Sequence, residues 1–261
     1  MLVEPKPSPM DLKWGMLGMP VRVSPMFFVA AVLLGWRTSK PWADATGQSQ
    51  GAILFTWVFA MFAGILVHEL GHAVVARLSG ARNVRIVLYH LGGLAISEGR
   101  RLRWQRVLEL LMGPGAGFML GGLCYGVRAL ADARGWQLPP LVEFFLSSSI
   151  WIGLIWGLVN LLPVFPLDGG QITRELLEAW RPYDGMRIAF RVSVVASILA
   201  ACAGAYFRDL LVVLMFAYFA YFNWQLSRLP PSGGGGFGGG QPAQGAEPRQ
   251  PWERDPDWWK G

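Results

Sequence analysis

The chain has 261 residues, of which 53% are hydrophobic and only 15% are charged. This composition excludes an ordinary soluble domain with a hydrated surface and favours a protein that lies in a lipid bilayer. The formal net charge of +6 does not indicate nucleic-acid binding, because the arginines cluster in short loops beside apolar segments, as the positive-inside rule describes.

Residues 1–20 lack the apolar core and the small-residue cleavage site of a signal peptide, so we expect them to be retained as an N-terminal cytoplasmic segment. Apolar stretches follow within residues 21–229, and a helix needs about 20 such residues to cross a hydrocarbon core about 30 Å thick. We therefore predict an all-α polytopic membrane protein with about six transmembrane helices. The stretches are residues 21–36, 51–76, 107–130, 144–165, 188–207 and 210–224, of which the first and the last are short.

The loop between the second and third stretches carries seven arginines and a single acidic residue, Glu98. Because Lys and Arg accumulate in cytoplasmic loops, we expect this loop on the cytoplasmic side of the membrane. Alternating from there places both chain termini in the cytoplasm. The sequence thus predicts an integral protein of the cell (inner) membrane.

His68, Glu69 and His72 form an H-E-x-x-H motif, HELGH, near the end of the second stretch. On a helix, positions i and i+4 share one face, so both imidazoles can bind one Zn²⁺ while the glutamate acts as a general base. Residues 51–67 contain no charged side chain. We therefore expect a metal site below the lipid surface, where ionisable side chains are costly and indicate function. The alternative is an ordinary helix end with two interfacial histidines.

After the motif, apolar and β-branched residues alternate on both sides of a glycine pair, Gly92 and Gly93. Alternation around Gly-Gly predicts a β-hairpin that turns at the two glycines and lies against the membrane surface. An irregular interfacial loop is the alternative interpretation.

A catalytic zinc usually takes three protein ligands, so one more is needed. Asp168 is the best candidate, because it follows a span that ends on the same side of the membrane as the HELGH motif. Two prolines interrupt the helix just before Asp168, and such an interruption is tolerated at membrane depth only where it is buried or lines a cavity. Glu98 or Glu109 as the third ligand, in a membrane-anchored gluzincin, is the alternative. We assign no ligand role to His90.

Beyond Leu229 the sequence becomes rich in Gly, Pro and Gln, a composition that cannot bury enough apolar surface to become ordered. We expect residues 230–261 to be a disordered cytoplasmic tail, separate from the domain formed by residues 21–229. The tryptophan-rich end of this tail leaves open that it docks to an unidentified partner.

The HELGH motif on one span and NLLPVFPLDGG on a later one resemble the site-2 protease family of intramembrane zinc metalloproteases, peptidase family M50. The match runs from residue 51 to about residue 178. The resemblance implies that Asp168 is the third zinc ligand beside His68 and His72. It also implies that Asn160 orients the substrate or stabilises the oxyanion. The family's G-P-x-x-N segment has Gly117 in place of its asparagine here.

The resemblance further implies a zinc-dependent intramembrane endopeptidase with one Zn²⁺ per chain and with Glu69 and Asn160 as catalytic residues. Its substrates would be single-span membrane proteins cut in or near their transmembrane segments, as in regulated intramembrane proteolysis. The partners expected are therefore these substrates and the lipid bilayer, not nucleic acid. The alternative is a non-proteolytic zinc-binding membrane protein, such as a transporter or an inactive relative, which needs the ligands but no general base.

Overall fold

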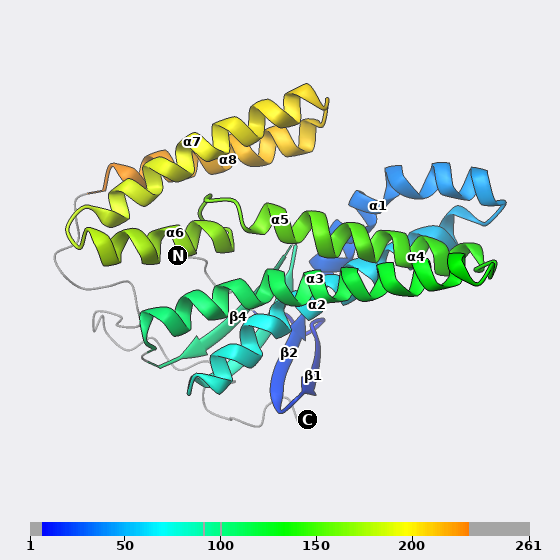
Figure 1. Cartoon of the computed structure of the whole chain (residues 1–261), viewed down its shortest axis with the longest axis horizontal. Coiled ribbons are helices and arrows are strands. Elements are labelled where there is room, and N and C mark those ends of the chain that lie inside the picture. The colour runs from blue at the N-terminus through cyan, green and yellow to red at the C-terminus, as the bar shows by residue number, and fades with distance from the viewer. Residues whose placement is uncertain (1–6, 91, 100, 230–261) are drawn as a thin grey trace.

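The computed structural model describes residues 7–90, 92–99 and 101–229, so the expected tail at 230–261 lies outside the described residues. Helices form most of this part of the chain, and a small sheet lies among them (Figure 1). In chain order the elements are β1 (Leu12–Met16), β2 (Met19–Val23), α1 (Pro25–Thr46), α2 (Gln50–Leu78), β3 (Arg82–Tyr89), β4 (Gly92–Glu98), α3 (Arg103–Ala133), α4 (Pro140–Trp151), the π-helical turn η1 (Ile152–Trp156), α5 (Gly157–Asn160), α6 (Asp168–Trp180), α7 (Gly185–Tyr206) and α8 (Leu210–Ser227).

Within the described residues, five helical segments are long and apolar enough to cross a membrane: α2, α3, the continuous segment Pro140–Asn160, α7 and α8. They coincide with five of the six stretches expected from hydropathy, and they make the chain an integral membrane protein. The remaining stretch, residues 21–36, begins in strand β2 and continues into α1. Helix α1 is not among the five, because Arg37, Lys40 and Asp44 make its C-terminal half polar.

The sheet has four strands in the order β1-β2-β3-β4, with β2 and β3 parallel and the other two pairs antiparallel. Strands β3 and β4 were predicted from the sequence, whereas β1 and β2 were not. Strand β2 runs across the expected domain boundary between residues 20 and 21, and its Val21 and Val23 are fully buried. Residues 12–20 therefore pack with the helical domain.

The expected hairpin is present, but its predicted turn at the glycines is wrong. Gly92 pairs with Tyr89 and Gly93 pairs with Leu88, so both glycines lie in strand β4. The turn precedes them and includes His90, whose φ of 43° lies in the left-handed region that a tight hairpin turn requires. Gly93 instead lies in close contact with α2, where its missing side chain leaves space for Glu69.

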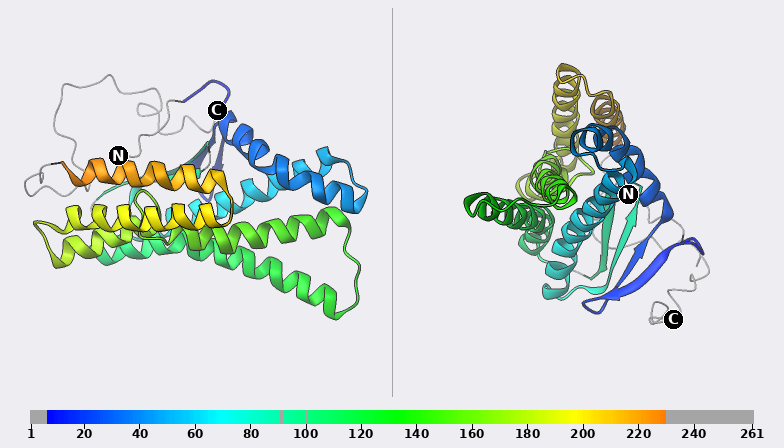
Figure 2. Two further views of the ribbon diagram at one scale, coloured as in Figure 1. Left: turned by 90° about the horizontal axis from the view of Figure 1, so that it is seen from above. Right: turned by 90° about the vertical axis from the view of Figure 1, so that its right-hand side faces the viewer.

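Helix α2 lies at the centre of the molecule and contacts α1, α3, α4 and both strands of the β3–β4 hairpin. The end-on view of Figure 2 shows the sheet beside α2, and α7 and α8 as a pair at the edge of the helical group. Helix α7 packs on α6 and α8. The core is apolar and centred on α2, with buried residues that include Ile53, Trp57, Ala60, Met61 and Ile65.

Candidate metal centre

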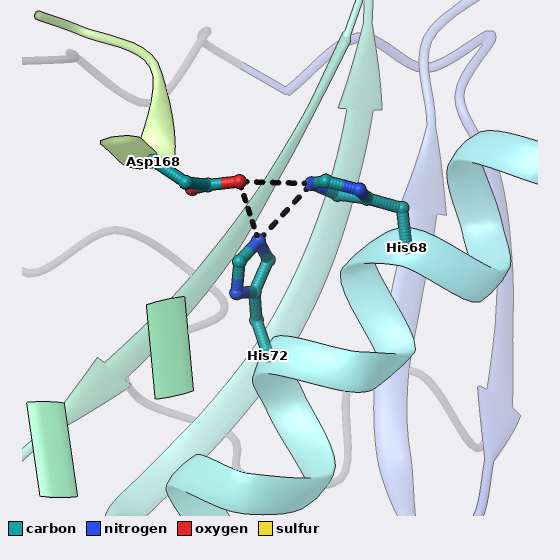
Figure 3. A group of neighbouring side chains, drawn as sticks. All are labelled: His68, His72 and Asp168. Atoms are coloured by element: carbon teal, nitrogen blue, oxygen red, sulfur yellow. Dashed lines mark hydrogen bonds and ion pairs between the residues drawn. The ribbon is translucent and has the colours of Figure 1, made fainter. Parts of the chain in front are cut away.

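Three side chains from two helices that are far apart in the sequence point toward one another (Figure 3). His68 and His72 lie one turn apart on α2, and Asp168 is the first residue of α6. Asp168 Oδ2 lies 3.2 Å from His68 Nε2 and 3.4 Å from His72 Nε2, while the two Nε2 atoms are 3.1 Å apart. All three residues are buried.

These three distances fit the edges of a zinc coordination tetrahedron. Ligand atoms about 2.0–2.1 Å from a tetrahedral Zn²⁺ lie about 3.3–3.4 Å from one another. Two imidazole nitrogens and one carboxylate oxygen also make a common ligand set of a catalytic zinc site, which leaves one position open. The donor set and its spacing therefore fit a single zinc ion.

His72 is held in the orientation that a metal ligand needs. Its Nδ1 lies 2.8 Å from the backbone carbonyl oxygen of Glu109 on α3. Because a carbonyl only accepts, Nδ1 carries the proton and Nε2 faces the site unprotonated. Gly113, one turn further along α3, leaves room for the ring: a Cβ there would lie 2.1 Å from His72 Nε2.

Asp168 reaches the histidines because the chain breaks between α5 and α6. Pro163 and Pro166 prevent a continuous helix across residues 161–167, so α6 starts afresh at the aspartate. The buried Asp168 Oδ2 faces the two imidazole nitrogens and has no hydrogen-bond partner among the described residues. An ionised carboxylate at this position is the form that binds a metal.

Glu69 follows His68 on α2 and is buried against strand β4. A Cβ on Gly93 would lie 2.3 Å from Glu69 Cγ, so only glycine fits at this position of the strand. Gly93 thus lets the sheet pack directly on the expected general base.

The two alternative carboxylate ligands are engaged elsewhere. Glu109 is buried and forms ion pairs with Arg101 and with Arg106, the latter at 2.7 Å. Glu98 is exposed at the end of β4 and accepts a 2.8 Å hydrogen bond from Asn83. Among the residues that the structure describes, only Asp168 joins the two motif histidines in a possible ligand group.

The other polar candidates lie outside this group. His90 is exposed in the β3–β4 turn, with its ring 5.4 Å from that of Tyr89. Asn160 is half-buried at the end of α5, and no hydrogen bond of its side chain is found within the described part of the chain. Its catalytic role therefore stays a prediction. The role of the Glu109 carbonyl was not predicted, because a backbone acceptor has no sequence signature. The steric role of Gly113 was not predicted either, although Gly113 begins the segment that resembles G-P-x-x-N.

The chain is similar to several known proteins. The model of peptidase family M50 matches residues 56–133 and 126–201, which together span more than half of the chain and include both histidines and Asp168. Zinc metalloprotease MJ0392 of Methanocaldococcus jannaschii is 28% identical over 174 residues, which are 66% of this chain and 48% of that protein. Rip3 of Mycobacterium tuberculosis is 34% identical over 163 residues, 61% of this chain and 38% of that protein.

The chain thus spans about half the length of these curated relatives or less. Among solved structures, the site-2 protease from Methanocaldococcus jannaschii matches 84% of this chain and 96% of its own, with a TM-score of 0.54 and 19% sequence identity. This likeness shows that the two proteins share a fold.

Proposed function

The chain belongs to peptidase family M50, and from that membership we propose that it is a zinc-dependent endopeptidase that cuts peptide bonds in or near transmembrane segments of membrane proteins. One observation carries the proposal: His68, His72 and Asp168 converge with the spacing of a zinc tetrahedron. They do so in a buried site beside the apolar helix α2, where such side chains are costly unless they serve a function.

The residues around this site have distinct roles in the proposed mechanism. Zinc, when bound, would lower the pKa of water and polarise the scissile carbonyl. Glu69 accepts the proton of the attacking water and later donates it to the leaving amine. The Glu109 carbonyl keeps His72 in the tautomer that offers Nε2. Asn160 orients the substrate or donates a hydrogen bond to the developing oxyanion.

Strand β4 gives the substrate a place to bind. It is the last strand of the sheet in the order β1-β2-β3-β4, and its Gly93 lies directly on Glu69. A peptide bond in a transmembrane helix is already hydrogen-bonded, so the substrate must unwind before it can be cut. An unwound segment that added to the β4 edge would pass beside the general base.

The substrates proposed are single-span membrane proteins, including membrane-tethered regulators, and each chain would use one zinc ion. The site faces the cytoplasmic half of the bilayer, with both chain termini in the cytoplasm. The arginines of the segment between α2 and α3 support this orientation, because α2 ends and α3 begins on that side. The cell (inner) membrane is the location that we propose.

The test is cleavage of tagged single-span substrates by the purified protein, with the cut position read by mass spectrometry. A zinc chelator should stop cleavage, and added zinc should restore it. Glu69→Gln should keep the zinc and lower kcat/KM by about 10²–10⁴-fold, the usual contribution of a general base. Asp44→Asn, which alters an exposed carboxylate on α1, serves as the matched control.

Cleavage that survives Glu69→Gln or complete removal of zinc would overturn the proposed mechanism. If the wild-type protein binds zinc but cuts none of a panel of substrates, and Glu69→Gln changes no measured property, the non-proteolytic alternative is favoured. Glu69 separates the two functions because a transporter or a zinc-storage protein needs no general base.

A further inference from the structure

Both backbone polar groups of Phe165, in the break before α6, are held by buried side chains from α7 and α8. The Phe165 N–H donates to Ser193 Oγ on α7 at 3.1 Å. Asn223 on α8 donates from Nδ2 to the Phe165 carbonyl at 2.6 Å and to the Phe219 carbonyl at 2.8 Å. Ser193 is 1% exposed and Asn223 is fully buried.

The side chain of Phe165 is held by the same two helices. Its ring lies 5.6 Å from the ring of Phe190 on α7 and stacks at 6.3 Å on Phe222 of α8. The α7–α8 pair therefore contacts the N–H, the carbonyl and the side chain of a single loop residue. Polar backbone in an apolar environment must find partners, and here two separate helices supply them.

The position of Phe165 is coupled to that of the metal-ligand candidate Asp168. The first turn of α6 packs so closely on the loop that a Cβ on Gly170 would lie 2.2 Å from Phe165 N. The loop is closed by a 2.8 Å hydrogen bond from Leu167 N to Val164 O. A shift of the Phe165 peptide would therefore push on the turn that presents the Asp168 carboxylate.

We propose that Ser193 and Asn223 are positioning residues, which clamp the Phe165 peptide and thereby hold Asp168 within reach of the two motif histidines. This inference rests on the proposed metal role of Asp168. The family match ends at residue 201, so Asn223 lies outside the segment that it covers. Neither residue touches the candidate ligands, and both act through the loop.

The test compares zinc binding by the full chain in detergent and its variants. Zinc affinity is measured by competition with a chromogenic chelator, and ligand geometry by the visible spectrum of the Co²⁺-substituted protein. Ser193→Ala and Asn223→Ala should each weaken zinc binding by about 10–100-fold, the usual effect of residues that orient metal ligands, and should shift the Co²⁺ bands. Ser193→Thr, which keeps the hydroxyl, should bind more tightly than Ser193→Ala.

The matched control is Ser197→Ala. Ser197 is a fully buried serine one turn along α7, and its hydroxyl donates only to its own helix, to Ser193 O at 2.7 Å. This variant should bind zinc within about twofold of wild type, because metal affinity depends on groups that orient the ligands. If Asn223→Ala does not fold, Ser193→Ala, which deletes a single oxygen, decides alone.

The proposed positioning role of Ser193 and Asn223 is overturned if folded Ser193→Ala binds zinc within twofold of wild type with an unchanged Co²⁺ spectrum. It is also overturned if Ser193→Ala unfolds while Ser197→Ala stays folded, since the hydroxyl would then serve the fold in general. Failure of the wild-type protein to bind zinc would instead contradict the metal centre itself, so the two failures are distinguishable.

Discussion

Replacing Gly113 by alanine tests the packing of α3 on the ligand His72. The added Cβ would lie 2.1 Å from His72 Nε2 and 2.3 Å from Cε1, whereas ordinary contacts begin at 3.4 Å. The ring must therefore retreat by about 1.3 Å, and zinc–ligand distances tolerate only about 0.2 Å. We expect the variant to lose His72 as a ligand and to bind zinc at least about 100-fold more weakly.

The assay is chelator competition on the purified variant, with Gly122→Ala as the matched control. Gly122 lies on the same helix, and a Cβ there meets no atom within 4 Å. Since alanine favours helix over glycine by about 1 kcal/mol, neither substitution should weaken α3 by propensity. Wild-type zinc affinity in Gly113→Ala would refute the described packing of His72 on α3.

Three further predictions concern the other parts of the site and the tail. Asp168→Ala should remove most of the bound zinc. Glu109→Gln should keep the zinc but lower the free energy of unfolding by about 3 kcal/mol, because a buried ion pair is lost. Metal analysis and thermal unfolding compare the two variants, and zinc loss in Glu109→Gln alone would favour the gluzincin alternative. Gly93→Ala should bind zinc normally but cut substrate poorly, because its Cβ would lie 2.3 Å from Glu69 Cγ; full activity would show that β4 does not pack on the general base. Deleting residues 230–261 should leave zinc content and cleavage unchanged, and lost activity would reveal a role for the tail.

Hydropathy sufficed to predict the membrane helices, because a bilayer imposes a length and an apolar composition that are visible locally. It failed at residues 21–36, where an apolar run is divided between β2 and α1. Strand β2 pairs in parallel with β3, more than 60 residues away, and nothing local in the sequence indicates such a partner. The hairpin turn was misplaced for a related reason: Gly92 and Gly93 suggested a turn, whereas Gly93 provides space for Glu69.

The residues of the metal centre likewise fall into those that the sequence predicts and those that only the folded structure shows. The spacing of His68 and His72 is a local helical pattern, so these two ligand candidates could be predicted from the sequence. Asp168 lies 100 positions after His68, and elimination among the carboxylates together with the family resemblance singled it out. The groups that orient the site, such as the Glu109 carbonyl and Asn223, become visible only when the helices are packed.

The coordination of zinc in the purified protein tests the central claim most directly. Metal analysis together with X-ray absorption at the zinc edge should find one zinc per chain, with two imidazole nitrogens and a carboxylate oxygen about 2.0–2.1 Å from the metal. In Asp168→Ala, any zinc that remains should keep both imidazoles and lose the carboxylate. Absence of zinc from the wild-type protein, or an unchanged ligand set in Asp168→Ala, would contradict the account.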